Sequence, residues 1–330
     1  YPAPRPAPGR PMDAAGGGTD LRIHEALTRV MQNIERAVVG KQREIQYVLA
    51  ALLCQGHVLI EDVPGVGKTT LVRSLARSLG CDFRRIQFTP DLLPSDVTGV
   101  SVYNQKTGEF EFRPGPIMSQ IVLADEINRT TPKTQSALLE CMEEGQVTID
   151  GVTRRLPRPF LVLATQNPIE YEGTFPLPEA QLDRFLLKLR LGYPTLREEM
   201  LVVERAKQPP LEELEQVLTA DEVLRLQQAA RSVHVGEAVL EYVVRLVQAT
   251  REHRDAYLGA SPRGSIALYR TSQAIALIRG REYVTPDDVK EMAPLVLAHR
   301  VILRPEAQVR GTGAEELIAE VLTQVPVPTG

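Results

Sequence analysis

The fold of this chain is decided by the stretch Leu59-Ile60-Glu61-Asp62-Val63-Pro64-Gly65-Val66-Gly67-Lys68-Thr69-Thr70. Its apolar start is typical of a strand, and its end is typical of the first turn of a helix. The glycines between them give the backbone room to approach a ligand closely. Bare N–H groups in such a loop, together with the positive end of the helix, bind phosphate. The stretch therefore predicts a phosphate-binding loop that joins a strand to a helix.

Two side chains of this loop have separate tasks in such a site. Lys68 is long enough to reach the β- and γ-phosphates, and the Thr69 hydroxyl is suited to hold Mg²⁺. The usual G-x-x-x-x-G-K-[ST] pattern has glycine where this chain has Asp62. The alternative is a glycine turn without a ligand, which the flanking strand and helix disfavour. The residues predicted to bind the nucleotide are Pro64, Gly65, Val66, Gly67, Lys68, Thr69 and Thr70.

Around this loop, short apolar runs alternate with segments of helical periodicity. Such alternation predicts an α/β fold with a parallel sheet that helices cover on both faces. Two segments with strand alternation break the rhythm and predict β-hairpins, which we interpret as insertions. The five predicted strands are residues 57–61, 83–88, 121–125, 160–165 and 185–191. The two predicted hairpins are residues 99–113 and 146–156, the second with Asp150-Gly151 at its turn.

The composition changes at both ends of this α/β region. Residues 1–20 are rich in proline, glycine and alanine, which predicts a flexible tail without a signal peptide. After Tyr193-Pro194 only helical signals remain, with Thr219 and Thr285 as predicted N-caps. We therefore predict a tail over 1–20, an α/β nucleotide-binding domain over 21–194 and an all-α domain over 195–330.

The overall composition excludes several classes of protein. With 38 Lys and Arg against 42 Asp and Glu, the net charge of −4 argues against broad nucleic-acid binding. No apolar run approaches the ~18 residues of a membrane span, so we expect no membrane partner. The 3 cysteines are widely spaced and form no C-x-x-C pair, which favours a reducing compartment and a cytoplasmic location.

Polar residues follow two further predicted strands at the edge where open α/β sheets bind ligands. Asp125 is placed to bind Mg²⁺, and Glu126 to orient and deprotonate an attacking water. Asn167 follows the next strand, where its amide suits the same water or the γ-phosphate. Taken alone, the acidic pair could also be a solvated turn, and Asn167-Pro168 is more often merely a turn. Because these residues are predicted to lie in the same sheet as Lys68, their pattern favours nucleotide hydrolysis.

The motifs together are similar to those of a known family. They resemble MoxR-type AAA+ ATPases of the helix-2-insert branch, over about residues 21–325. The segments that carry the resemblance are Pro64-Gly65-Val66-Gly67-Lys68-Thr69, Ala124-Asp125-Glu126-Ile127-Asn128-Arg129, Pro132-Lys133-Thr134-Gln135-Ser136-Ala137-Leu138-Leu139-Glu140, Ala164-Thr165-Gln166-Asn167-Pro168 and Gln181-Leu182-Asp183-Arg184-Phe185. The resemblance implies a P-loop core with two hairpin insertions and a helical lid, ATP and Mg²⁺ as cofactors, and a ring that is usually hexameric.

The resemblance also implies roles for residues outside the phosphate loop. Asn167 matches sensor 1, Arg184 the arginine finger offered to the next subunit, and Arg263 sensor 2 of the lid. Val39 and Gly40 match neighbours of the adenine. Arg263 has independent support, because a cation in the first turn of a helix is opposed by the helix dipole and so suggests an anionic partner. Whether Arg263 acts in its own subunit or the next stays open.

The function implied by the resemblance is that of an ATP-hydrolysing, chaperone-like remodeller of protein clients. Such relatives assist assembly or cofactor insertion and work with partners that carry a von Willebrand factor A domain. One alternative is a nucleic-acid motor, for which Arg154, Arg155 and Arg158 offer a small basic edge. Another is a nucleotide-gated scaffold with negligible turnover, which Glu126 and Asn167 disfavour.

Overall fold

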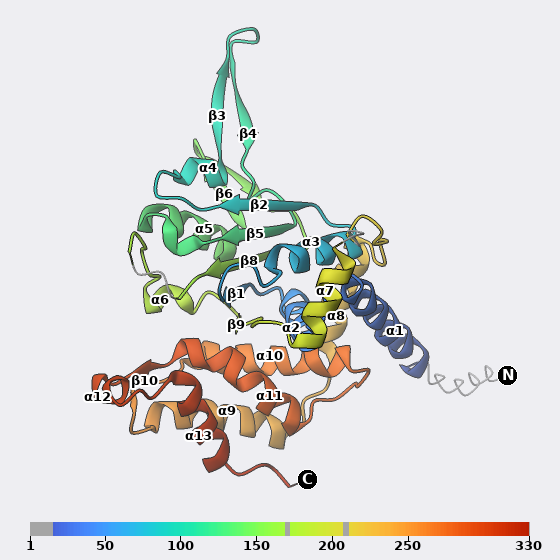
Figure 1. Ribbon diagram of the computed structural model, residues 1–330, viewed down its shortest axis with the longest axis vertical. Helices are drawn as coiled ribbons and strands as arrows, with labels where there is room; N and C mark the ends of the chain where they lie inside the picture. The colour runs from blue at the N-terminus through green and yellow to red at the C-terminus, as the bar shows by residue number, and fades with distance from the viewer. Residues whose placement is uncertain (1–15, 169–171, 207–210, 330) are drawn as a thin grey trace, which may run out of the picture.

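The computed structural model describes residues 16–168, 172–206 and 211–329. Its centre is a parallel sheet of five strands in the order β2-β5-β8-β1-β9, which confirms the predicted α/β fold (Figure 1). The ends of the strands differ from the predicted ends by up to two residues. These strands are β1 (Val58–Glu61), β2 (Phe83–Gln87), β5 (Ile121–Asp125), β8 (Leu161–Gln166) and β9 (Leu187–Leu189).

The two faces of this sheet belong to two separate hydrophobic cores. Alternate side chains point to opposite faces of a strand, so Val58 and Ile60 enter one core while Leu59 enters the other. The first core contains α1 (Gly16–Glu35), α2 (Gln42–Leu53), α3 (Lys68–Ser78) and the C-terminal helices. The second contains α4 (Pro94–Thr98), the 3₁₀ helix η1 (Ile127–Arg129) and α5 (Pro132–Glu144).

Both predicted hairpins are present beside the second core. They are β3 (Gly99–Asn104) with β4 (Glu109–Pro114), and β6 (Gln146–Ile149) with β7 (Val152–Arg155). The first projects from the rest of the molecule in Figure 1. Asp150 and Gly151 both have positive φ, 51° and 75°, as a two-residue hairpin turn requires.

The C-terminal part is a helical lid beneath the sheet in Figure 1. The prediction that it is entirely helical was wrong in one detail, because β10 (Ala256–Leu258) and β11 (Ile302–Leu303) form an antiparallel pair. Strands of two or three residues are too short to show a period of two. The helices are α8 (Ala220–Ser232), α9 (Glu237–Glu252), α10 (Pro262–Ile278), α11 (Pro286–Leu297), η2 (Ala298–Arg300), α12 (Pro305–Val309) and α13 (Ala314–Gln324), and α6 (Glu179–Leu182) and α7 (Leu196–Arg205) precede them.

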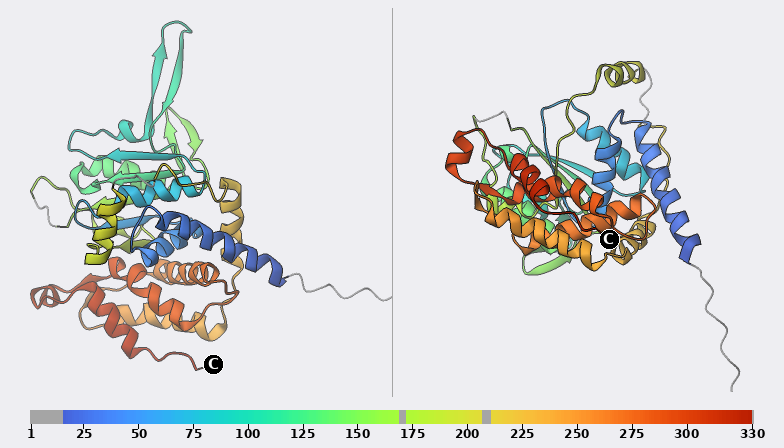
Figure 2. Two further views of the ribbon diagram at one scale, coloured as in Figure 1. Left: turned by 45° about the vertical axis from the view of Figure 1, so that its right-hand side comes forward. Right: turned by 90° about the horizontal axis from the view of Figure 1, so that it is seen from below.

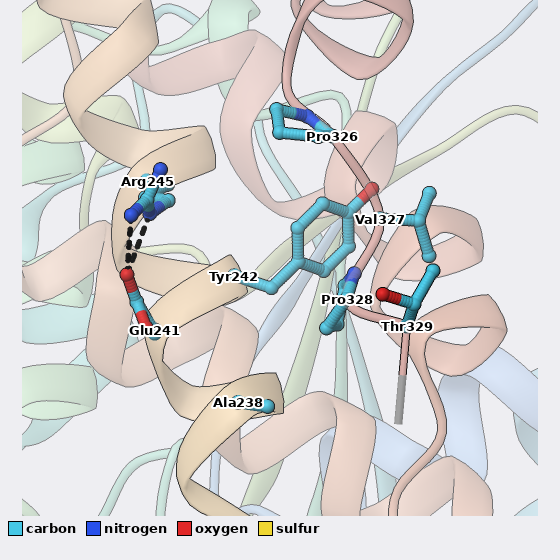
Figure 3. A pocket seen from close by; sticks show the side chains of 8 residues that line it. All are labelled: Ala238, Glu241, Tyr242, Arg245, Pro326, Val327, Pro328 and Thr329. Atoms are coloured by element: carbon cyan, nitrogen blue, oxygen red, sulfur yellow. Dashed lines mark hydrogen bonds and ion pairs between the residues drawn. The ribbon is translucent and has the colours of Figure 1, made fainter.

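The two ends of the chain differ from each other. Helix α1 begins at Gly16, inside the segment predicted to be a tail, and residues 1–15 lie outside the described residues. At the other end, the segment from Pro326 to Thr329 passes beside Tyr242 of α9, next to the ion pair of Glu241 with Arg245 (Figure 3). Among the described residues, no helix has the length and apolarity to cross a membrane.

Candidate functional site

The phosphate-binding loop joins β1 to α3, as predicted. Gly65 and Gly67 have φ of 82° and 91°, which a side chain would strain. A Cβ built on either glycine would meet no atom within 4 Å, so the space above the loop is open. Helix α3 begins at Lys68, and its first amide with an intrahelical acceptor is that of Leu71, which donates to Gly67 O (3.0 Å). The preceding amides remain available for phosphate oxygens.

Asp62, the departure from the usual loop pattern, has a structural task of its own. Its carboxylate accepts hydrogen bonds from the amides of Leu191 (2.6 Å) and Gly192 (2.8 Å), and also from Val63 (3.0 Å). The side chain is buried. Asp62 therefore ties the phosphate loop to the connection that leads from β9 into α7. Sequence reasoning missed this role, although the non-glycine residue at that position was its signal.

The predicted adenine neighbours lie beside the same connection. Gly40 has a φ of 70°, and a Cβ on it would come 2.1 Å from a carboxylate oxygen of Glu198 in the first turn of α7. Next to it, the buried Lys41 ammonium donates to Leu191 O. Leu191 is thus held by Asp62 through its N–H and by Lys41 through its C=O. Gly40 therefore lies against the start of α7, and Lys41 connects this segment through Leu191 to Asp62 of the loop.

Asp125 and Asn167 lie at the carboxyl ends of neighbouring strands. Asp125 ends β5, and its Oδ1 accepts a hydrogen bond from the Thr165 hydroxyl (2.6 Å). Its Oδ2 pairs with the Arg85 guanidinium at 2.5 Å. Asn167 directly follows β8, and its carbonyl accepts from Asn128 Nδ2 (3.4 Å). The structure thus brings both to the edge at which β1 enters the phosphate loop.

Glu126 has a left-handed backbone conformation, with φ 58° and ψ 53°. Such a conformation is uncommon for a residue other than glycine and typically costs about 1–3 kcal/mol. The Glu126 N–H donates to the Thr165 hydroxyl (2.9 Å), which helps to hold this turn. The carboxylate accepts from Gln87 Nε2 (3.2 Å) and pairs with Arg129 (3.1 Å). Thr165 therefore positions both acidic residues, and the sequence analysis did not identify it.

A partly buried ion pair stabilises the strand that leads into the loop. Glu61, the last residue of β1, pairs with Lys188 of β9 (2.8 Å) and accepts from Gln166 of β8 (3.1 Å). Burial alone would raise the pKa of Glu61, but the hydrogen bond and charge of Lys188 hold that pKa below its usual value. The carboxylate therefore stays charged and joins three adjacent strands just below the site.

Arg184 and Arg263 lie at the opposite, amino edge of the sheet. Arg184 precedes β9, whose residue Leu187 is in register with Val58 at the start of β1. Arg184 pairs with Glu143 (3.3 Å), near the end of α5, and Arg263 of α10 approaches the same carboxylate (3.8 Å). Arg263 also lies 3.8 Å from Asp183. The two predicted cations are thus together, but apart from the phosphate loop of their own chain.

Comparison with known proteins assigns this chain to a family. The model of the ATPase family associated with various cellular activities (AAA) matches residues 57–187, and that of the AAA lid domain matches residues 248–321. The chain is 44% identical over 328 residues to Chaperone MoxR1 of Mycobacterium tuberculosis, covering 96% of this chain and 86% of the relative. It is 33% identical over 336 residues to Protein MoxR of Methylorubrum extorquens, covering 94% and 97%. The chain belongs to the MoxR family of AAA+ ATPases.

A solved structure agrees with this membership. A crystal structure of a Cytophaga hutchinsonii protein, described as a candidate ATPase, superposes with a TM-score of 0.89 at 41% identity. The match covers 94% of this chain and 98% of that one. As a MoxR-family AAA+ ATPase, the protein hydrolyses ATP and uses Mg²⁺, which confirms the predicted activity and cofactors.

The residues present fit these cofactors. The open loop above Gly65 and Gly67 suits a chain of phosphates, with Lys68 as their cationic partner. Carboxylate and hydroxyl oxygens are ligands that Mg²⁺ prefers, and Asp125 at the strand end and Thr69 in the first turn of α3 are the residues that would hold it. Bound Mg²⁺ supplies charge neutralisation on the β- and γ-phosphates.

Proposed function

We propose that this MoxR-family ATPase works as a ring, hexameric by resemblance, in which each nucleotide site is completed by the neighbouring subunit. The observation that carries the proposal is the shared carboxylate of Glu143, which holds Arg184 and Arg263 at the amino edge. The phosphate loop, Asp125 and Asn167 lie at the carboxyl edge of the same sheet. Because these two arginines lie at the edge opposite the phosphate loop of their own chain, we propose that the phosphate they contact is bound by another subunit.

Within one subunit, the proposed roles follow from position. Lys68 and the loop amides bind the β- and γ-phosphates, with Pro64, Val66 and Thr70 shaping the loop, while Val39 and Gly40 border the adenine. Glu126 orients and deprotonates the attacking water, and the Asn167 amide holds that water against the γ-phosphate. In the structure Glu126 is hydrogen-bonded to Gln87, so it turns away from β2 to act as a base.

Across the subunit boundary, the two arginines act on charge that develops in the transition state. Arg184 stabilises the transferring γ-phosphoryl group of the next subunit, the task of an arginine finger. Arg263 binds the same phosphate from the lid, in trans, because both arginines lie against Glu143. Glu143 holds them in place while no phosphate is near.

We infer that the ring remodels protein clients as a chaperone, with assembly or cofactor insertion as the outcome. The name of the mycobacterial relative, Chaperone MoxR1, supports this role. A partner with a von Willebrand factor A domain is proposed from the family resemblance alone. The basic edge expected of a nucleic-acid motor is partly engaged within the protein, since the Arg154 guanidinium lies 3.9 Å from the centre of the Phe112 ring.

The proposed location is the cytoplasm. The chain's three cysteines, Cys54, Cys81 and Cys141, are free thiols. Burial raises the pKa of these thiols to about 12, 11 and 11 respectively. Free thiols are typical of proteins in a reducing compartment.

The ring is tested by the dependence of ATPase activity on protein concentration. If each site needs its neighbour, the rate per subunit falls on dilution below the concentration at which sedimentation shows ring assembly. A rate per subunit that stays constant while the protein disassembles contradicts the proposal. For the client, stimulation by a captured protein supports remodelling, whereas stimulation by DNA with a steep salt dependence favours the nucleic-acid motor.

A further inference from the structure

Helix α7 presents an apolar stripe directly to solvent. Leu196, Met200 and Val203 follow the i, i+4, i+7 spacing of one helix face and are 78%, 56% and 66% exposed. The opposite face of α7 points to the body, where the Arg205 guanidinium donates to the carbonyls of Glu35 (3.2 Å) and Arg36 (2.9 Å). No residue of α7 is buried. This stripe is a hydrophobic surface that the single chain leaves uncovered.

The lid carries a hydrophobic groove between α9 and α10. Its volume is about 710 Å³, and Ile266 and Leu240 within it are 52% and 43% exposed. The α10 side of the groove begins at Pro262, next to Arg263. The apolar residues that line it are Leu240, Val243, Val244, Pro262, Ile266 and Tyr269.

The chain's own C-terminal segment does not fill this groove. It lies over the neighbouring flank of α9, where Pro326 and Val327 pass beside Tyr242 (Figure 3). One flank of α9 is therefore covered by the chain's end, while the flank that carries Leu240 and Val244 stays open. Among the described residues, no segment of the chain covers this groove, so its surface is open to a partner.

The stripe and the groove match in length and in charge. The distance from Leu196 to Val203, and that from Pro262 to Tyr269, is in each case seven helical steps, or about 10 Å. Glu199 and Glu204 flank the stripe at helical spacing, and Arg251 and Arg270 line the groove. Within the described parts of the chain, none of these four side chains forms an ion pair.

The two surfaces also lie on opposite sides of the molecule. In the right-hand view of Figure 2, α7 (yellow-green) projects at one side and α9 (light orange) lies along the other. The stripe is on the side of the phosphate loop, since Gly40 touches Glu198 of α7. The groove is on the side of the arginines, since Arg263 is in the first turn of α10. Two different, complementary surfaces on opposite sides are the requirement for a head-to-tail ring.

We propose that α7 of one subunit docks into the α9–α10 groove of the next subunit. The contact buries Leu196, Met200 and Val203 against Ile266 and brings the Arg263 end of α10 to the neighbour's nucleotide site. This docking contact rests on the ring proposed above, and it identifies the surfaces through which neighbouring subunits bind each other. Because α7 follows Gly192, which is bound to Asp62 beside the phosphate loop, the docked helix also connects nucleotide binding to the subunit boundary.

Assembly of charge variants tests this contact by sedimentation with ATP. Met200→Glu buries a carboxylate in the groove and Ile266→Lys buries an ammonium against the stripe, so each raises the concentration for assembly by about tenfold or more. The double variant Met200→Glu/Ile266→Lys pairs the two charges at every boundary and recovers part of the loss. Val309→Glu is the matched control: Val309 is 89% exposed on α12, outside both surfaces, and its variant assembles like the parent.

Disulfide cross-linking distinguishes a wrong contact from a wrong ring. Met200→Cys/Ile266→Cys gives a ladder of covalently linked subunits after oxidation with ATP, and the parent with its native cysteines gives none. If the parent forms rings but the ladder is absent and Met200→Glu assembles normally, the docking contact is overturned and the ring stands. If the parent does not assemble at any concentration of ATP, both proposals are overturned.

Discussion

The carboxyl and amino edges of the central sheet differ in how their charges are satisfied. At the carboxyl edge, open loop amides and Lys68 leave space for phosphate, and the acidic residues are braced by Thr165. At the amino edge, two arginines share the carboxylate of Glu143. The first edge is built to receive a ligand within one subunit. The charges of the second are satisfied by Glu143 of the same chain, and in the proposed ring the phosphate of a neighbouring subunit would take the place of that carboxylate.

The largest expected effect on ATP turnover is that of removing Arg184 from the amino edge. Arg184→Ala retains ATP binding, because Lys68 and the loop amides remain, but loses about 10³–10⁵-fold in turnover. Steady-state ATPase assays with a nucleotide-binding measurement check both parts. Glu143→Gln is the matched control, because it removes the resting partner and leaves the finger, so its turnover stays within a few-fold. Normal turnover of Arg184→Ala would contradict its assigned role.

At the carboxyl edge, replacing the proposed base has the next largest effect. Glu126→Gln binds ATP but turns it over about 10²–10⁴-fold more slowly, because an amide does not accept the proton of the attacking water. Gln87→Ala removes a hydrogen-bond partner of Glu126 and leaves the base itself intact. Turnover of Gln87→Ala is therefore expected within a few-fold of the parent. Near-normal turnover of Glu126→Gln would assign the base role elsewhere.

A smaller effect is expected at Asp62, which connects the phosphate loop to the start of α7. Asp62→Gly restores the usual loop pattern but leaves the amides of Leu191 and Gly192 without their acceptor, at about 1–3 kcal/mol of stability. Denaturant unfolding measures the loss, and ATP affinity stays within a few-fold because the loop amides remain. Asp62→Asn keeps one acceptor oxygen, so its stability is expected to lie between that of the parent and that of Asp62→Gly. Full stability of Asp62→Gly would show that these hydrogen bonds contribute nothing net.

An effect on stability of similar size concerns pH and the amino edge. Burial lowers the pKa of His57 to about 4, and its ring accepts from the Val162 amide (3.0 Å) and faces Met142 O (3.0 Å). Between pH 6.5 and 5 the unfolded chain therefore binds a proton that the folded chain does not. Stability from this group is complete above pH 6.5 and falls by about 2 kcal/mol at pH 5.

The variant that isolates this group is His57→Gln, which cannot titrate. Its free energy of unfolding should fall less steeply from pH 7 to 5 than that of the parent, as measured by urea unfolding at each pH. His299, whose pKa burial lowers to about 3, contributes the same trend in both proteins. Equal slopes for parent and variant would contradict the assignment to His57.

Much of this architecture was predictable because it depends on local patterns. The alternation of apolar runs and helices gave the five strands, and Asp150-Gly151 gave the second hairpin turn. The contacts that the sequence did not predict join distant segments. Examples are the hydrogen bonds of Thr165 with Asp125 and Glu126, and that of Asp62 with Leu191. These bonds depend on which strands become neighbours, and the periodicity of one segment does not encode that. The short β10–β11 pair was missed for a related reason, since its pairing is tertiary.

The central claim, that one subunit's amino edge completes the next subunit's carboxyl edge, is tested most directly by mixing two inactive variants. Lys68→Ala lacks the phosphate contact and keeps Arg184, whereas Arg184→Ala keeps an intact loop and lacks the finger. Once sedimentation shows that mixed rings form, the account predicts that ATPase activity returns, because some boundaries join an intact loop to an intact Arg184. Mixed rings without any return of activity would contradict it.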